Sequence, residues 1–263
     1  MSDHWYKPDG TPCHTVPRAK GDGERPTTLA DARKLGLYPS VTTILNIVDK
    51  PQLTTWRITE ALKLARLVPP EGDETPEAYA SRIMERSHEE TTGAAADEGS
   101  RIHAAIEAHY RGEAVPEEYA AHVAGTVKAV EQAFPGVTDW VPEQRVVGKA
   151  GFAGTCDLHS PSHHIVVDFK CKAFDHDKAS KLAYDQVRQL AAYAHALFPA
   201  WWEDYTRVPR CANVFVSRTK PGHVLVHEWT MAEVEKGRDR FYAAFDLWQL
   251  ERDYVPVRGP LYA

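Results

Sequence analysis

The sequence predicts an α/β protein in which helices flank a mixed central β-sheet and a helical part comes before it. Three observations lead to this prediction. Apolar residues recur at helical spacing through 76–134, whereas 139–172 contains three short apolar runs separated by turn residues. An amphipathic segment at 180–198 follows, and two more strand-like runs and a closing helix complete the chain. Helices followed by a β-β-β-α-β run pack most simply on one sheet.

Local signals predict the elements of the first half. Residues 1–37 are rich in Pro, Gly and charge, which predicts an irregular arm or a long loop packed on the body. Ser40 or Thr42 would cap a short helix, and Pro51 would open a second one. Further helices are expected near 76–88, 94–111 and 116–134.

Turn residues divide the second half. Tight connections at Lys149–Gly151 and Ser160–His163 would join three strands, and another at Lys220–Gly222 would join the last two. The amphipathic helix lies between these two groups of strands, and a terminal helix is expected at 230–254.

The length of 263 residues fits one large domain or two small ones. We expect a single domain over 1–263. It would comprise the arm at 1–37, a helical part at 38–134 and a sheet-containing catalytic core at 135–263.

Composition excludes several classes of protein. None of the four cysteines forms a C-x-x-C pair, so we expect neither a zinc ribbon nor an iron–sulfur cluster. A P-loop and a G-x-G-x-x-G turn are both absent from the sequence, which predicts no nucleotide cofactor. No apolar stretch approaches the roughly 18–20 residues of a membrane span, and the polar N-terminus lacks a signal core. We therefore expect a cytoplasmic protein that binds no membrane. The net charge of −6 argues against coating of nucleic acid but leaves a local basic groove open.

Two neighbouring predicted strands each end in an aspartate. Asp157 closes "GFAGTCD" and Asp168 closes the apolar run "HHIVVD". Carboxylates placed in this way can share a hard cation such as Mg²⁺. Lys170 lies two residues after Asp168 and so faces the same side, where it would stabilise charge on a phosphoryl group. The carbonyl of Phe169 would add an oxygen ligand. The alternative is a pair of exposed turn aspartates and a solvated lysine, because a D-x-K triplet alone is a weak motif.

Three further positions are candidates for the same site. His103 follows Gly99 on a predicted helix and would serve as an additional metal ligand, although a lone helical histidine is more often structural. Gln189 and Tyr193 share one helix face, where they would contact a phosphate or a base, or simply form a polar rim. Glu143 would point toward the same region or stay an exposed strand residue.

Together these motifs resemble the PD-(D/E)XK nuclease superfamily, specifically its RecB-like exonuclease branch. That branch carries G-x-x-x-H, G-x-x-D, D-x-K and Q-x-x-x-Y elements in this order. The stretch "PSVTTIL" is also similar to the N-terminal element of phage RecB-like nucleases and of the mitochondrial genome maintenance exonuclease. The matching pairs, within about 95–200 by motif, are Gly99/His103, Gly154/Asp157, Asp168/Lys170 and Gln189/Tyr193.

The resemblance implies a restriction-endonuclease-like core and a role for each matching residue. Asp157 and Asp168 would bind Mg²⁺ or Mn²⁺, His103 would be a further ligand, and Lys170 would be the catalytic lysine. Gln189 and Tyr193 would support the site and contact DNA. The sequence departs from part of the family in two ways: its second acidic residue is Asp rather than Glu, and its cysteines do not fit the four-cysteine cluster of some relatives.

We therefore expect a metal-dependent DNA exonuclease that acts on ends, preferably single-stranded, in phage or mobile-element DNA processing, with a single-strand annealing or binding protein as a candidate partner. One alternative is a double-strand-specific 5′ exonuclease beside an annealing protein. Another is a catalytically inactive nucleic-acid-binding module. The candidate phosphate contacts are Ser40, Thr42, Lys149, Lys172 and Arg188.

Overall fold

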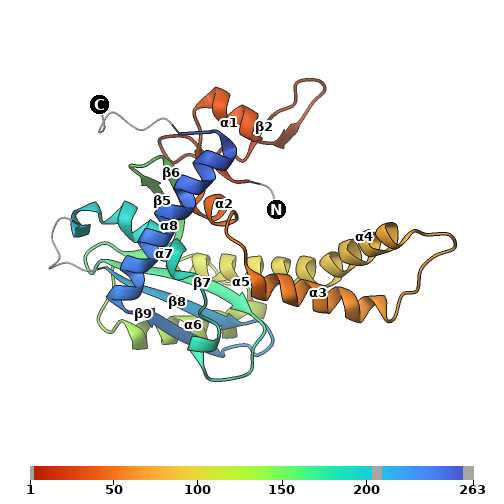
Figure 1. Cartoon of the computed structure of the whole chain (residues 1–263). Coiled ribbons are helices and arrows are strands. Elements are labelled where there is room, and N and C mark those ends of the chain that lie inside the picture. The colour runs from red at the N-terminus through yellow and green to blue at the C-terminus, as the bar shows by residue number, and fades with distance from the viewer. Residues whose placement is uncertain (1–2, 203–208, 257–263) are drawn as a thin grey trace.

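A computed structural model describes residues 3–202 and 209–256 of the chain. Its centre is a five-stranded sheet in the order β5-β6-β7-β8-β9 (Figure 1). Neighbouring strands are antiparallel except for β7 and β8, which are parallel, so the expected mixed sheet is confirmed. The strands are β5 (Val141–Gly148), β6 (Phe152–Ser160), β7 (Ile165–Lys172), β8 (Arg210–Ser217) and β9 (Val224–Trp229).

Helices cover both faces of this sheet. One face packs against α5 (Ala94–Tyr110) and α6 (Ala120–Ala133), and the other against α7 (Val187–Leu197) and α8 (Met231–Arg252). Strand β7 shows the alternation that makes this possible. Val166 belongs to the core under α7 and α8, whereas Val167 belongs to the core under α5 and α6. The result is a three-layer α/β arrangement.

Helix α7 lies within the connection between the parallel strands β7 and β8, where a long crossover is required. It begins at Val187, seven residues later than expected. A short 3-10 helix, Ala179–Lys181, occupies part of the segment before it. The carbonyl of Leu182 accepts hydrogen bonds from the side chains of Lys172 and Gln186. In a longer helix this carbonyl would accept a backbone N–H instead.

The segment at 1–37 packs on the body, as one of the two expectations had it, but the expectation that it is irregular is wrong. This segment holds a small helix and strands, and Trp5 is fully buried beside Trp248. Thr28 and Asp31 form a capping box that starts the helix. Strands of two or three residues leave no recognisable period in a sequence. The elements are β1 (Trp5–Tyr6), which pairs with β4 (Tyr38–Pro39), β2 (Thr15–Pro17), which pairs with β3 (Glu24–Pro26), and α1 (Leu29–Leu35).

Ser40 caps the short helix α2 (Val41–Leu45), as one of the two expected residues. Two longer helices, α3 (Pro51–Ala65) and α4 (Pro76–Ser87), form a hairpin that projects from the body (Figure 1). We call this α3–α4 hairpin the arm, which is not the segment expected to be irregular at 1–37. A π-helical turn, His88–Gly93, joins α4 to α5, and a 3-10 turn, Glu117–Tyr119, precedes α6.

Contacts at the far end of the arm hold its two helices together. The hydroxyl of Tyr79 on α4 donates to the carbonyls of Ala65 and Val68, and Arg82 pairs with Glu74 at 2.6 Å. In the described parts of the chain, no helix has both the length and the apolar character needed to cross a membrane.

Candidate active site

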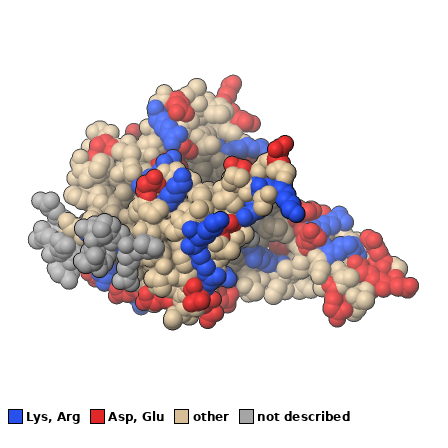
Figure 2. Space-filling view, turned by 90° about the horizontal axis from the view of Figure 1, so that it is seen from above, with Lys and Arg blue, Asp and Glu red and all other residues tan. Residues whose placement is uncertain are grey.

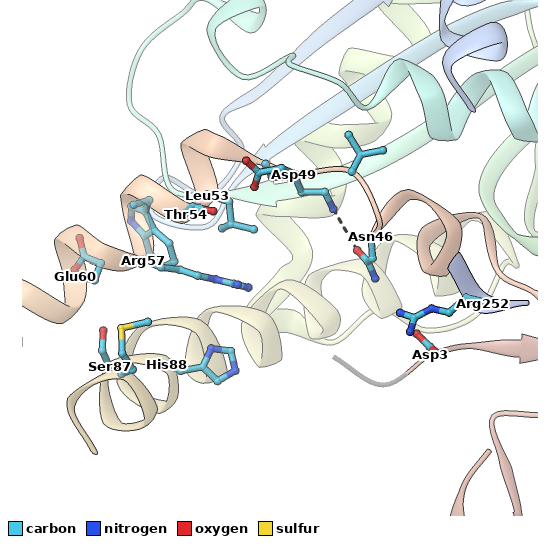
Figure 3. Close-up of a pocket in the computed structure, with 14 residues that line it drawn as sticks. Asp3, Asn46, Asp49, Leu53, Thr54, Arg57, Glu60, Ser87, His88 and Arg252 are labelled. Atoms are coloured by element: carbon cyan, nitrogen blue, oxygen red, sulfur yellow. Dashed lines mark hydrogen bonds between the residues drawn. The ribbon is translucent and has the colours of Figure 1, made fainter. Parts of the chain in front are cut away.

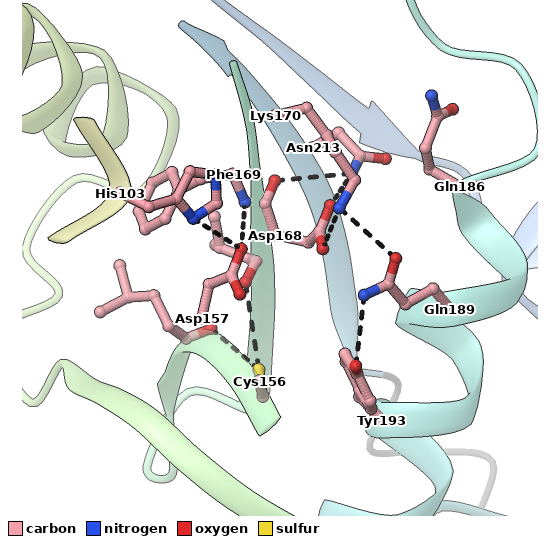
Figure 4. A network of polar contacts seen from close by, with 12 residues as sticks. His103, Cys156, Asp157, Asp168, Phe169, Lys170, Gln186, Gln189, Tyr193 and Asn213 are labelled. Carbon is pink, nitrogen blue, oxygen red and sulfur yellow. Dashed lines mark hydrogen bonds and ion pairs between the residues drawn. The ribbon is translucent and has the colours of Figure 1, made fainter. Parts of the chain in front are cut away.

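The ladder between β6 and β7 ends where the two predicted carboxylates stand. Pairing runs from Ser160–Ile165 to Leu158–Val167, and the next pair in register would be Asp157 and Asp168. The backbone N–H of Phe169 instead donates to Oδ2 of Asp157 at 2.7 Å (Figure 4). The Asp157 carboxylate therefore occupies the gap that opens between the strands.

The pleat of β6 is irregular at the same point. Cys156 packs in the core under α7, yet Leu158, two residues later, packs in the core under α5. Regular alternation would place both on one face. On β5, Glu143 stands opposite Asp157 in register, is unpaired and has a positive φ of 49°. This irregularity brings Glu143 beside the site, and it turns the Asp157 side chain toward β7.

Asp168 is buried and held on both oxygens. Its side chain is 1% exposed; Oδ1 accepts from Lys170 Nζ at 2.7 Å, and Oδ2 accepts from Asn213 Nδ2 at 2.7 Å. Asn213 Oδ1 in turn accepts from Trp229 Nε1 at 2.8 Å. Sequence reasoning missed Asn213 and Trp229. The available signal was an amide inside the apolar run "CANVFV", because a buried amide needs hydrogen-bond partners.

Helix α7 closes the other side of the site through the predicted Q-x-x-x-Y pair. Gln189 Oε1 lies 3.4 Å from Lys170 Nζ, and Gln189 Nε2 donates to the hydroxyl of Tyr193 at 3.2 Å. The Tyr193 ring packs directly on Gly154, where a Cβ atom would lie 2.8 Å from Cε1 of the ring. Tyr193 is 3% exposed, so the expected stacking of this ring on a base is wrong: it supports Gln189 from within the core.

His103 reaches the site from α5. Its Nδ1 lies 3.9 Å from Oδ2 of Asp157, and its ring meets that of Phe169 edge to face. Burial and the charge of Lys170 lower the pKa of His103, which favours the neutral imidazole that can bind a cation. Gly99 lies inside α5 rather than at its start, and it faces Cys171 of β7.

The electrostatic balance of the site favours a bound cation. Burial, followed by the negative charge of Asp168, raises the pKa of Asp157 to about 8. Burial alone would lower the pKa of Lys170, but the charges of Asp168 and Asp157 outweigh it and raise that pKa. The raised pKa of Asp157 shows that a second negative charge beside Asp168 is unfavourable in the metal-free site, and a bound cation would offset that charge.

The donors also have the chemistry that Mg²⁺ or Mn²⁺ requires. Asp157 and Asp168 offer carboxylate oxygens, and His103 offers a ring nitrogen. The N–H and C=O of one strand residue point to the same side, so the Phe169 carbonyl faces the gap beside Asp157. Within the described residues, no three His, Cys, Asp or Glu side chains already form a metal-holding group. Lys170 occupies Oδ1 of Asp168, and a cation there would share that oxygen.

A cavity of about 420 Å³ opens beside these groups. Helix α5 contributes small residues on one side, and His103 and Glu107 stand among them. Phe169, Lys170 and Cys171 of β7 form the other side. Two of the candidate metal-binding residues, His103 and Phe169, therefore border a space that a substrate can enter, whereas Asp157 and Asp168 lie behind them and do not line it.

Three of the expected phosphate contacts stand elsewhere or have other partners. Lys149 lies in the turn between β5 and β6. Strand β6 begins at Phe152, and Asp157 lies five residues further, a distance of about 16 Å along the strand. Lys149 is thus not brought to the site. Ser40 is buried, and its hydroxyl accepts from the N–H of Thr43 as a helix cap. Thr42 is exposed next to it, 3.0 Å from the Ser40 hydroxyl.

The other two lie near the site. Lys172 follows Lys170 on the same face of β7, but its Nζ donates to the Leu182 carbonyl at 2.9 Å. Burial, together with the charge of Lys170, lowers the pKa of Lys172. Arg188 adjoins Gln189 on α7, with Nη1 3.7 Å from Asp185. Its buried Nε has no hydrogen-bond partner in the described part of the chain.

Comparison with known proteins adds little. No family model matches the chain, and no curated protein matches it. Among solved structures, that of SSO0001 aligns with 73% of this chain and 86% of its own, at 13% identity and a TM-score of 0.28. A likeness of this size carries no conclusion about fold family or activity.

Proposed function

We propose that the chain is a metal-dependent deoxyribonuclease with a PD-(D/E)XK core of the RecB-like branch. The proposal depends on the fact that four motifs, separated in the sequence, meet in space. They form one set of contacts, from His103 through Asp157, Asp168 and Lys170 to Gln189. Solvated turn residues, the main alternative for the two carboxylates and the lysine, would not be buried against one another in this way.

The proposed metal is Mg²⁺ or Mn²⁺, held by Asp157 and Asp168, with His103 and the Phe169 carbonyl as further ligands. Bound there, it would polarise a phosphoryl oxygen and lower the pKa of a nearby water. No iron–sulfur cluster and no nucleotide cofactor are part of the proposal.

Lys170 carries the protein's own share of the chemistry. Lys170 is one of the residues that line the 420 Å³ cavity, and its ammonium stays charged beside Asp168. From there it would orient the attacking water and stabilise the negative charge that develops on the phosphoryl group. Gln189 positions Lys170 from one side, and Tyr193, fixed against Gly154, positions Gln189. Asn213 holds the far oxygen of Asp168, which keeps its partner oxygen directed to Lys170 and the metal site.

We further propose an exonuclease that digests single-stranded ends, in phage or mobile-element DNA processing. The partners would be DNA and a single-strand annealing or binding protein, within a bacterial cytoplasm. A double-strand-specific 5′ exonuclease beside an annealing protein uses the same residues. An inactive DNA-binding module is less well supported, because binding alone does not require two carboxylates grouped with a lysine.

A substrate panel tests these possibilities. Purified protein is incubated with Mg²⁺ or Mn²⁺ and end-labelled linear single strands, linear duplexes and single-stranded circles. We expect digestion of linear single strands, intact circles and complete loss of activity in EDTA. Preference for the duplex would favour the double-strand alternative, cleavage of circles would indicate an endonuclease, and binding of all DNA without cleavage would leave the binding module.

A further inference from the structure

A second cavity, of about 560 Å³, lies where the arm meets the body (Figure 3). Helix α3 and the last turn of α4 form one side of it, and the segment after α2 and the end of α8 form the other. Its size is typical of sites for small ligands or nucleotides. The charged and aromatic residues that line it include Asp3, Asp49, Lys50, Trp56, Arg57 and Arg252.

Cationic side chains converge on this cavity without ion-pair partners. Arg57 and Arg252 extend into it from opposite sides, and neither pairs with a carboxylate among the described residues (Figure 3). The Nε–H of Arg57 is buried and lacks a hydrogen-bond partner there. Lys50 donates only a long hydrogen bond, 3.3 Å, to Asn46. A buried donor without a protein partner is costly, so this N–H is available to donate to a group that enters the cavity.

The acidic residues of the lining do not cancel these cations. Glu60 already pairs with Lys63 at 2.7 Å, which leaves Asp3 and Asp49 against three cations. Figure 2 shows Lys and Arg side chains around the hollow at the base of the arm and Asp and Glu side chains at its tip. In a chain of net charge −6, the base of the arm is thus a local site for an anion.

An aromatic residue adds a second kind of contact. Trp56 borders the cavity and is 41% exposed, and Met84, which also lines it, is 43% exposed. An accessible indole next to guanidinium groups is the combination that binds single-stranded nucleic acid, because bases stack on the ring while cations hold the backbone. A small inorganic anion would need only the cations.

We infer that this cavity binds the phosphate backbone of a single-stranded nucleic acid, with Arg57 and Arg252 on phosphate and Trp56 under a base. The cavity is close in sequence to the candidate active site. His88, at the start of the π-helical turn, borders one cavity, and Ala96 of α5, eight residues later, borders the other. The further claim, that the bound strand is the one cleaved, rests on the proposed function. The phosphate would be either terminal or internal to the strand.

Binding without cleavage tests this inference. Fluorescence anisotropy is measured in EDTA, across a range of NaCl concentrations, with a short, internally labelled single strand. The strand ends in a 5′-phosphate, a 3′-phosphate or hydroxyls. The variants are Arg57→Gln, Arg252→Gln and Trp56→Ala. Arg66→Gln is the matched control, because Arg66 is exposed on the same arm but does not line the cavity. Melting curves verify that each variant is folded.

We expect each cavity arginine variant to weaken binding about tenfold and to lower the salt slope by about 0.7 per lost contact, while Arg66→Gln changes neither. Trp56→Ala should weaken binding by a similar factor and leave the slope unchanged, because stacking releases no counterions. An effect confined to one phosphorylated end identifies a terminal phosphate, and an equal effect on all three strands identifies an internal one.

Binding within twofold of the wild type in both arginine variants, or no binding by the wild type, overturns the inference. These outcomes are separate from those of the proposed function. A chain that binds through Arg57 but cleaves no DNA keeps the cavity and refutes the nuclease. A chain that cleaves DNA but binds equally well without Arg57 and Arg252 does the reverse.

Discussion

Asp157 and Asp168 face each other in the register of β6 and β7, one residue beyond the last pair of the ladder. A gap in a ladder normally costs hydrogen bonds, and here the Asp157 carboxylate recovers one by accepting the N–H of Phe169. Two carboxylates at such an opening, Asp168 buried and Asp157 largely so, destabilise the metal-free fold and suit a cation. The Asp157 carboxylate therefore lowers the stability of the metal-free protein and is required for the proposed function.

The substitution Asp157→Asn should stabilise the metal-free protein while it abolishes nuclease activity. Asparagine keeps an acceptor for the Phe169 N–H and removes the charge that Asp168 opposes. Thermal unfolding in EDTA near pH 8 should show a gain of about 1 kcal/mol or more. Added Mg²⁺ should raise the melting temperature of the wild type only. A less stable variant in EDTA would contradict the electrostatic account.

The same substitution has a defined pH signature. The pKa of Asp157 is about 8 in the folded chain, so the folded chain holds a proton that the unfolded chain releases above about pH 4. Stability then falls as pH rises across this window, since the folded state binds more protons. The stability difference between Asp157→Asn and wild type should grow from pH 5 to pH 8 in EDTA. A difference that is constant with pH would show that the pKa is not raised.

Asn213→Ala should weaken metal binding about 10- to 100-fold, because the Asp168 carboxylate loses the donor that orients it. Titration calorimetry with Mn²⁺ measures the change directly. Ser217→Ala is a matched control: it removes another buried polar side chain from β8, one that bonds to Phe174. Equal loss of metal affinity in both variants would mean that general destabilisation, and not Asn213, is the cause.

Gly154→Ala should cost about 1–3 kcal/mol, the usual penalty for overpacking a core. The new methyl group would meet the Tyr193 ring at 2.8 Å. Tyr193→Leu should remove much of this penalty, so the two changes together should cost less than their sum. Urea denaturation of the four proteins gives the coupling energy. Additive costs would show that the ring does not rest on Gly154.

Trp5→Ala should cost about 3–5 kcal/mol, as for any fully buried large aromatic residue. Trp5 packs near Trp248 of α8 and Tyr254, so the first residues of the chain belong to the main core. Equilibrium unfolding measures the loss. A cost below 1 kcal/mol would contradict the inclusion of the first residues in the main core.

The order of strands and helices along the chain could be predicted from sequence, because it depends on short-range periodicity. Asp157 and Asp168 were expected at strand ends, but they lie inside β6 and β7, at the point where the ladder between these strands stops. Their grouping with Lys170 and Gln189 follows the order of the motifs. The break in the pleat at Asp157 could not be predicted. It depends on the unusual backbone of Glu143 across the sheet, which no local pattern announces.

Roles that depend on burial were also beyond the sequence. Tyr193 looked like a ligand-facing residue by helical spacing, but the room that Gly154 leaves draws its ring into the core. Asn213 acts through its register with Asp168 on a strand more than forty residues later, a long-range pairing that only the folded sheet creates.

The most direct test of the central claim is nucleotide release from linear single-stranded DNA in Mg²⁺ by wild type, Lys170→Ala and Lys178→Ala. Lys178 is an exposed lysine in the same crossover and serves as the control. The account predicts rapid release by wild type and Lys178→Ala, and a loss of about 100- to 1,000-fold in Lys170→Ala. Equal release by all three proteins would contradict it, because cleavage would then not depend on the Asp157–Asp168–Lys170 site.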